Sequence, residues 1–281
     1  MDPHDGIKVK KNVPLRQNLL SIEKEHWKPP VYPNNPKFFQ KIRISLFRYL
    51  DLQLGTIWRD LSKVLPNVRG TVLDAGCGIQ PFRPMFSSEV RYIGLDTVDS
   101  KAHFGYEAPD TLYYSGETWP VGDQTADFIL CTETLEHIPD PSLFLQEAFR
   151  SLKPGGRLLL TVPFAARWHF IPYDYWRYTP SGLNHLLKTA GFSNIQVFSR
   201  GNQFTVVCYK MMGFIFSLLV PKSSSFLFEW ACRLTGLLAM PLFLMSAIFA
   251  NMTLQKSGTV DCLGFTALAE RPSETGPKEK S

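Results

Sequence analysis

The sequence predicts an α/β protein built on a doubly wound, mostly parallel sheet. Three observations lead to this class. Short apolar runs alternate with helical patterns from about residue 70 to residue 200. The first run ends in a tight turn at 74–78, Asp-Ala-Gly-Cys-Gly, and the second ends in Asp96. The two glycines let the backbone turn sharply beside a ligand, and an acid at the next strand end can accept the hydroxyls of a ribose.

The N-terminal part of the chain precedes this body. Residues 1–36 are polar and basic and contain prolines, so we expect a mobile arm. From 37 to 66, apolar residues recur mostly at three- and four-residue spacing, which predicts an extension of one or two amphipathic helices. We expect them to pack on the sheet or cover its ligand. Because Lys41, Arg43 and Arg48 lie among the apolar positions, a helix at a membrane interface is the alternative.

The body itself covers 67–202 and resumes at 258–271. Asp140 and Pro141 suit the N-cap and first turn of one of its helices, and the Pro-Gly-Gly run at 154–156 stops that helix. The pattern predicts strands near 71–74, 91–95, 111–114, 127–131, 157–162 and 194–199, and helices near 82–87, 141–152 and 180–190.

The segment 203–257 is strongly apolar. Two apolar stretches flank a polar turn at 221–225, and no charge occurs between Leu234 and Leu254, which matches the roughly 20-residue length of a bilayer crossing. We expect a hydrophobic helical hairpin that spans the membrane or dips into it, with a kink at Pro241. A buried helix pair that caps the domain or forms a dimer is the alternative. The polar residues 272–281 predict a disordered tail.

Composition limits the classes of partner and site. A net charge of +5 over 281 residues is too mild to predict a nucleic-acid partner. The five cysteines form no Cys-x-x-Cys pair, and no ligand cluster has metal-like spacing, so we expect free thiols and no metal. The first residues hold no apolar core, so we expect no secretory signal and a cytoplasmic location.

The glycine turn argues against a dinucleotide. A dinucleotide fingerprint has glycine at the first, third and sixth positions of its loop. Counted from Gly76, the sixth position is Pro81, which lacks an N–H group and blocks the close approach that the third glycine allows. A nicotinamide enzyme is therefore disfavoured.

The turn and four later stretches resemble a known family. Val-Leu-Asp-Ala-Gly-Cys-Gly at 72–78 resembles the first motif of class I S-adenosylmethionine-dependent methyltransferases of the type 11-like group. The later stretches follow in the family's order and, with the first, cover roughly a third of the chain: 117–121, 126–133, 135–140 and 152–160. The resemblance implies seven strands, an antiparallel last strand at 262–270 after the hairpin, and S-adenosylmethionine as cofactor.

The resemblance also implies which residues bind the cofactor. The methionine part would meet the turn, the ribose would meet the acid of the second strand, and the adenine would meet a loop near 115–117. Gln80 departs from the family, which has a further glycine there. A tight turn with a capping aspartate is the purely structural alternative. The implied contacts are Asp74, Ala75, Gly76, Gly78, Asp96, Ser115, Gly116, Glu117 and Thr132.

Catalytic candidates follow the fourth and fifth strands. Glu133 and His137 are four residues apart and share a face if the segment is helical. The near-neutral pKa of histidine suits deprotonation of a hydroxyl, and Glu133 could orient His137 or contact the cofactor. A histidine that merely holds a loop is the alternative. His169 and Asp174 are further candidate bases.

The stretch 167–178, Arg-Trp-His-Phe-Ile-Pro-Tyr-Asp-Tyr-Trp-Arg-Tyr, predicts the acceptor site. Aromatic faces stack on sugars, and arginine pairs with phosphate. A similar stretch occurs in methyltransferases of bacterial cell-envelope polysaccharide clusters. A lid that packs on the sheet, with an internal Asp174–Arg177 ion pair, is the alternative. The acceptor candidates are Trp168, His169, Tyr173, Asp174, Tyr175, Trp176 and Arg177.

Together these observations predict methyl transfer to a membrane-proximal acceptor at the cytoplasmic face of the inner membrane. The hydroxyl of a lipid-linked glycan is the first candidate, and a lipid or quinone headgroup is the second. A non-catalytic, membrane-attached adaptor that keeps the fold is the third hypothesis.

Overall fold

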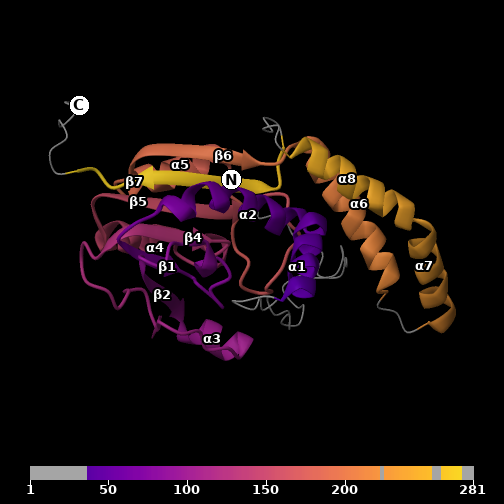
Figure 1. Cartoon of the computed structure of the whole chain (residues 1–281), viewed down its shortest axis with the longest axis horizontal. Coiled ribbons are helices and arrows are strands. Elements are labelled where there is room, and N and C mark those ends of the chain that lie inside the picture. The colour runs from indigo at the N-terminus through magenta and orange to yellow at the C-terminus, as the bar shows by residue number, and fades with distance from the viewer. Residues whose placement is uncertain (1–36, 222–224, 255–260, 274–281) are drawn as a thin grey trace, which may run out of the picture.

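The computed structural model describes residues 37–221, 225–254 and 261–273. They form a seven-stranded sheet in the order β3-β2-β1-β4-β5-β7-β6 (Figure 1). β7 is antiparallel to both neighbours and the other pairs are parallel, which confirms the predicted class and the antiparallel last strand. The strands are β1 (Thr71–Ala75), β2 (Arg91–Thr97), β3 (Thr111–Tyr114), β4 (Ala126–Thr132), β5 (Leu152–Pro163), β6 (Ser193–Arg200) and β7 (Gly264–Glu270).

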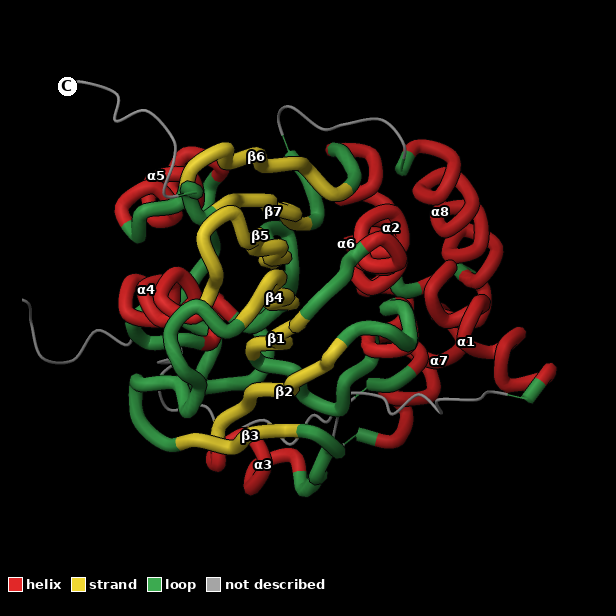
Figure 2. Tube along the Cα trace, turned by 60° about the vertical axis from the view of Figure 1, so that its left-hand side comes forward, coloured by secondary structure: helices red, strands yellow, loops and turns green. Residues whose placement is uncertain are grey.

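Helices cover both faces of the sheet. α4 and α5 lie on one face and α2 lies on the other (Figure 2). The helices are α1 (Phe38–Leu50), α2 (Leu52–Val64), α3 (Val98–Phe104), α4 (Pro141–Ser151), α5 (Pro180–Thr189), α6 (Gln203–Leu219), α7 (Phe226–Leu238) and α8 (Met240–Thr253).

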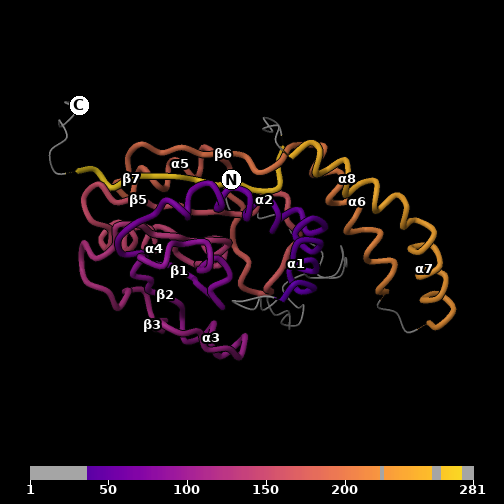
Figure 3. The backbone as a smooth tube through the Cα atoms, viewed as in Figure 1, coloured from indigo at the N-terminus to yellow at the C-terminus, as the bar shows by residue number. Residues whose placement is uncertain are grey.

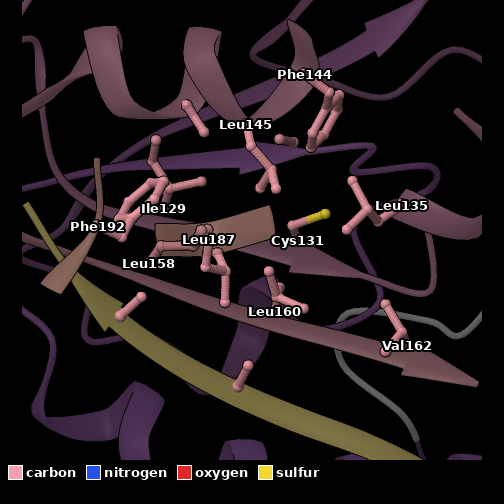
Figure 4. Packing of buried hydrophobic residues seen from close by; sticks show 14 of the residues in the cluster. Ile129, Cys131, Leu135, Phe144, Leu145, Leu158, Leu160, Val162, Leu187 and Phe192 are labelled. Carbon is pink, nitrogen blue, oxygen red and sulfur yellow. The ribbon is translucent and has the colours of Figure 1, made fainter. Parts of the chain in front are cut away.

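Each strand supplies side chains alternately to two core layers, as the pleat requires. Ile129 belongs to the layer beneath α4 and α5, whereas Phe128 belongs to the layer beneath α2. Figure 4 shows the first layer, in which Leu145 of α4 and Leu187 of α5 meet Leu158 of β5. This two-sided burial explains why the strands read as nearly continuous apolar runs.

The N-terminal extension consists of two helices, as predicted. The side chain of Asp51 accepts a hydrogen bond from the Leu54 amide at 3.1 Å and so caps the N-terminus of α2. This cap marks the boundary between α1 and α2. α2 packs on the sheet, while α1 leaves Phe38, Phe39 and Ile42 exposed. The predicted arm at 1–36 lies outside the described residues.

Two short segments differ from the sequence prediction. The expected helix at 82–87 is wrong, because only one 3₁₀ turn, Arg83–Met85, forms there. Pro81 and Pro84 both lack the N–H groups that a longer helix needs. Conversely, the unpredicted α3 begins after β2, where the Thr97 hydroxyl accepts from the Ser100 amide and caps it.

The apolar segment between β6 and β7 forms three helices instead of a two-armed hairpin. Its second arm breaks at Ala239 into α7 and α8, which are bent by 49° relative to each other, and Pro241 stands in the first turn of α8. The helices project from one end of the sheet (Figures 1 and 3). Among the described residues no single helix is long and apolar enough to cross a bilayer, although the bent α7–α8 pair qualifies by length and composition together.

The two ends of this insert meet at the sheet. Asn202 caps α6 and donates from Nδ2 to the Thr253 carbonyl at 2.8 Å. The Leu263 amide donates to the Arg200 carbonyl at 2.9 Å. Leu263 also packs with Leu52 and with residues of α6 and α8, so the insert is joined to the body by a small core of its own.

Candidate cofactor and acceptor site

The glycine turn lies at the carboxyl edge of the sheet, where β1 pairs with both β2 and β4 and the chain order reverses. Ligands bind at such reversals in open α/β sheets. The amides of Gly76 and Cys77 both donate to the Leu95 carbonyl, which fixes the turn against β2. Gly76 has a φ of 74°, and a Cβ there would lie 2.3 Å from the Thr134 side chain, so only glycine fits.

Asp96, the penultimate residue of β2, lies beside this turn and is almost fully buried. Its carboxylate accepts hydrogen bonds from the amides of Thr97 (2.7 Å) and Gly78 (3.0 Å). Burial raises the pKa of Asp96, while these hydrogen bonds oppose the shift. A carboxylate offers about four acceptor positions, so it can still accept ribose hydroxyls. Asp96 thus lies beside the glycine turn, and its role in binding a ribose stays a prediction.

Asp74 is a buried acid of this edge with one unsatisfied oxygen. It is 1% exposed, and its Oδ2 accepts from the Tyr92 hydroxyl at 2.5 Å. Its Oδ1 is buried without a hydrogen-bond partner among the described residues. Burial raises the pKa of Asp74 to about 7, although Tyr92 opposes the shift. An orphaned buried acceptor is costly unless a ligand supplies a donor, and the ammonium of an amino acid fits that need.

The remaining predicted cofactor contacts take different positions. Ala75 is fully buried in the core, so only its backbone can face a ligand. Ser115, Gly116 and Glu117 are exposed after β3, as an adenine-side loop requires. Trp119, two residues further on, is a core residue, because it is 2% exposed and its ring packs on Phe144.

The turn after β4 links the glycine turn to the acceptor side. The Thr134 hydroxyl donates to the Thr132 carbonyl at 3.0 Å and lies 3.5 Å from the Gly76 carbonyl oxygen. Thr132, the last residue of β4, therefore lies next to the glycine turn, and its contact with a cofactor stays a prediction.

Glu133 has a structural partner that the sequence did not indicate. Its carboxylate accepts from Nη2 of Arg200 at 2.7 Å, and Arg200 is 0% exposed. Glu133 has a φ of 46°, and the next turn, 3₁₀ at Leu135–His137, does not include it. Glu133 and His137 therefore do not share a helical face, and the expectation based on their spacing is wrong. The Tyr173 carbonyl, not Glu133, holds His137 through Nδ1 at 2.9 Å.

The acceptor stretch 167–178 docks on the turn after β4. Trp176 donates from Nε1 to the Ile138 carbonyl at 2.9 Å, and the Tyr178 hydroxyl donates to the Leu135 carbonyl at 3.1 Å. The side chains of Trp168, Tyr173, Tyr175 and Trp176 nevertheless stay exposed. Their rings thus remain available to a planar or sugar acceptor.

The charged residues of the stretch pair among themselves. Arg177 donates to both oxygens of Asp174, at 2.5 and 2.7 Å, and Nδ1 of His169 lies 3.2 Å from Oδ2 of Asp174. Burial opposes the ionised form, but the hydrogen bonds from Arg177 and His169 hold the pKa of Asp174 well below its usual range. The internal Asp174–Arg177 pair is therefore present. It engages both side chains and leaves the exposed rings as the acceptor candidates.

Aromatic rings connect the ribose acid to the acceptor stretch. The Tyr106 hydroxyl lies 3.5 Å from Asp96, and the Tyr106 ring stacks on Phe104 of α3. Phe104 stacks on Phe170, and the Phe170 ring centroid lies 5.1 Å from that of His137. Sequence analysis missed this chain of contacts, because α3 was not predicted. The run His-Phe-Gly-Tyr at 103–106 was the available signal.

The comparison with protein families decides the classification. A family model described as a methyltransferase domain matches residues 47–197. The chain belongs to this methyltransferase family. The resemblance seen in the glycine turn is thus confirmed, and with it a class I, S-adenosylmethionine-type fold. The finer likeness to enzymes of cell-envelope polysaccharide clusters stays a prediction.

Curated relatives match this methyltransferase over its body. A probable S-adenosylmethionine-dependent methyltransferase of Mycolicibacterium smegmatis is 30% identical, with 43% of this chain and 51% of the relative covered. A demethylmenaquinone methyltransferase of Listeria welshimeri is 27% identical, with 50% of this chain and 69% of the relative covered. The chain spans about half the length of the mycobacterial relatives it matches.

A solved structure matches more of the chain at lower identity. The S-adenosylmethionine-dependent methyltransferase of Thermotoga maritima, described as a possible histamine N-methyltransferase, has a TM-score of 0.49 and 16% identity. The match covers 83% of this chain and 96% of that one.

Proposed function

We propose that this methyltransferase transfers a methyl group from S-adenosylmethionine to an acceptor held by the exposed aromatic rings of 167–178. The observation that carries the proposal is the buried, unpartnered Oδ1 of Asp74 next to a glycine turn. Bound there, the cofactor supplies an electrophilic methyl group on a sulfonium. Asp74 would hold its ammonium, Asp96 its ribose hydroxyls, and 115–117 its adenine.

The chain's own task is to place the acceptor. In-line methyl transfer gains mainly from orientation, because the leaving group is already activated. The stretch 167–178 is fixed to the turn after β4 by the Trp176 and Tyr178 hydrogen bonds, while α3 contacts it through Phe170. An acceptor that stacks on Tyr173 or Trp176 would therefore be held by a preorganised wall.

A sugar hydroxyl of a lipid-linked glycan is our first acceptor, since four partly exposed aromatic rings suit the faces of sugars. A lipid or quinone headgroup is the alternative. It is supported by the 27% identical demethylmenaquinone methyltransferase. Both acceptors would present their reactive group close to a membrane.

The cofactor proposal is tested by calorimetric titration of S-adenosylmethionine into the detergent-purified full chain. We expect saturable binding that Asp96→Ala weakens by about 10- to 100-fold, because hydrogen bonds to a charged group contribute roughly 1.5–3 kcal/mol each. Asp99→Ala, an exposed acid on neighbouring α3, is the control and should bind normally. Absence of binding by folded wild-type protein would favour the adaptor hypothesis.

We further propose that α6–α8 attach the protein to the cytoplasmic face of the inner membrane. Phe226, Leu227 and Leu238 are 72%, 79% and 74% exposed. α7 and α8 carry only one opposite-charge pair, Glu229–Arg233. Burying each such apolar side chain contributes about 1.5–3 kcal/mol, so a lipid surface would satisfy this face.

Liposome sedimentation tests the attachment. We expect the wild-type chain to sediment with phosphatidylglycerol–phosphatidylethanolamine vesicles and Leu227→Glu/Leu238→Glu to remain in the supernatant with unchanged helix content. The control is Leu112→Glu, an exposed leucine of edge strand β3 far from the insert in sequence. A wild-type chain that ignores vesicles but elutes as a dimer would instead assign the face to a second copy.

A further inference from the structure

The structure brings three potential metal ligands together beside the acceptor stretch. Glu136 and His137 come from the 3₁₀ turn after β4, and His169 comes from the loop after β5. One ligand atom of each lies within 4.8 Å of the others. Sequence spacing predicted no metal, because His169 is remote from the other two residues along the chain.

Glu136 is the member that most needs a partner. It is 0% exposed, and neither of its carboxylate oxygens has a hydrogen-bond partner among the described residues. Its backbone is fixed, since its carbonyl accepts from the amides of Tyr175 and Trp176. The neighbouring Arg177 is engaged by Asp174 through two hydrogen bonds. Buried carboxylates are generally paired or bound to metal ions.

Both histidines are held as metal-binding histidines usually are. Nδ1 of His137 lies 2.9 Å from the Tyr173 carbonyl oxygen, and Nδ1 of His169 lies 3.0 Å from that of Arg167. Oδ2 of Asp174 also approaches Nδ1 of His169. A ring that donates from Nδ1 carries its lone pair on Nε2, and such carbonyl or carboxylate partners orient metal-ligating imidazoles.

The ligand atoms of this cluster are spaced nearly as closely as ligand atoms around a bound metal ion. Nε2 of His137 lies 3.7 Å from Oε1 of Glu136. Ligand atoms around an ion at about 2.0–2.2 Å lie roughly 3–3.5 Å apart, so the cluster must contract by about 1 Å. A rotation of half-buried His169 on its loop can supply that movement, because Glu136 and His137 are fixed by the turn.

We propose that Glu136, His137 and His169 bind one divalent transition-metal ion such as Zn²⁺. Two imidazoles and one carboxylate are a ligand set that leaves a coordination position open. If the proposed methyl transfer is correct, that position would take the acceptor oxygen and favour its deprotonation. The site is near the cofactor edge, since Thr134 of the same turn contacts Gly76.

Metal binding is measured on the tag-free full chain after treatment with chelator, by dialysis against Zn²⁺ and metal analysis. We expect about one equivalent per chain for wild type, and loss of that equivalent in Glu136→Gln and His169→Ala. His185→Ala, an exposed histidine of α5, should bind as wild type. Substitution by Co²⁺ should give ligand-field bands without the thiolate bands that cysteine ligation would produce.

The same proteins are titrated with S-adenosylmethionine by calorimetry. Normal cofactor binding by His169→Ala would show that the fold and the cofactor site are intact when the metal is lost. The metal proposal is overturned if wild type binds no Zn²⁺, or if both variants bind it as well as wild type does. Either result leaves the cofactor titration to decide the proposed function independently.

Discussion

Replacement of Asp74 by asparagine is expected to remove cofactor binding while making the cofactor-free protein more stable. In the proposed cofactor site, Oδ1 of its carboxylate is buried without a hydrogen-bond partner among the described residues. Truncating one partner of a buried charge pair costs about 2–5 kcal/mol, so we expect S-adenosylmethionine affinity to fall by roughly 30-fold to several thousand-fold. Titration calorimetry of both proteins at pH 8 measures this loss.

The stability gain follows from the pKa of Asp74. Burial raises it from 3.8 to about 7 in the folded protein. Because its pKa is raised in the folded protein, Asp74 contributes to folding stability in its protonated form. This contribution is complete below pH 4 and is lost as the pH rises through 7. The pKa shift corresponds to about 4 kcal/mol of folding stability that wild type loses at high pH. Asparagine does not ionise, so the variant keeps this stability.

Urea unfolding without cofactor at pH 5 and pH 8 tests the sign. The stability of Asp74→Asn relative to wild type should increase between these pH values, whereas exposed Asp99→Asn should show little change. Wild-type affinity for the cofactor should also rise with pH up to about 7. Unchanged affinity in the asparagine variant would remove Asp74 from the cofactor site.

Replacement of Arg200 by alanine is expected to cause the largest loss of stability. Its guanidinium joins β6 to three other segments, since it donates to Glu133, to the Val162 carbonyl at 3.0 Å and to Gln53 and Thr56 of α2. Removing one partner of a buried ion pair costs about 3–5 kcal/mol, because the other charge stays without compensation. Urea unfolding followed by circular dichroism measures the change.

Glu133→Gln, measured beside Arg200→Ala, distinguishes a structural role of Glu133 from a catalytic one. It leaves Arg200 buried without its counter-charge, so its stability should also fall substantially. Arg233→Ala, which breaks an exposed pair with Glu229, should cost less than about 1 kcal/mol. A Glu133→Gln variant of normal stability but impaired turnover would return Glu133 to a role in the reaction.

The sequence predicted the parts of this protein that local pattern determines. The strands and the glycine turn depend on apolar periodicity and on residues close together in the chain. In the structure Asp74 lies in β1, Gly76 follows it, and Asp96 accepts a hydrogen bond from the Gly78 amide. The antiparallel last strand came from a family resemblance, because residue spacing does not encode which strands pair.

The rest depends on contacts between distant segments. Arg200 meets Glu133 only after β6 and β4 enter the same sheet. Likewise, His169 approaches Glu136 only after its loop docks on the turn following β4. The helix predicted at 82–87 failed for a local reason, since two prolines outweighed the apolar pattern.

The closed base of the insert has an evolutionary consequence. Because the chain leaves β6 and returns to β7 within hydrogen-bond reach, the pairing of these strands does not depend on what lies between them. An ancestor could therefore have gained, lost or lengthened α6–α8 by recombination at this one junction without disturbing the strand register. If α6–α8 attach the protein to a membrane as we propose, attachment and chemistry would then be separable traits.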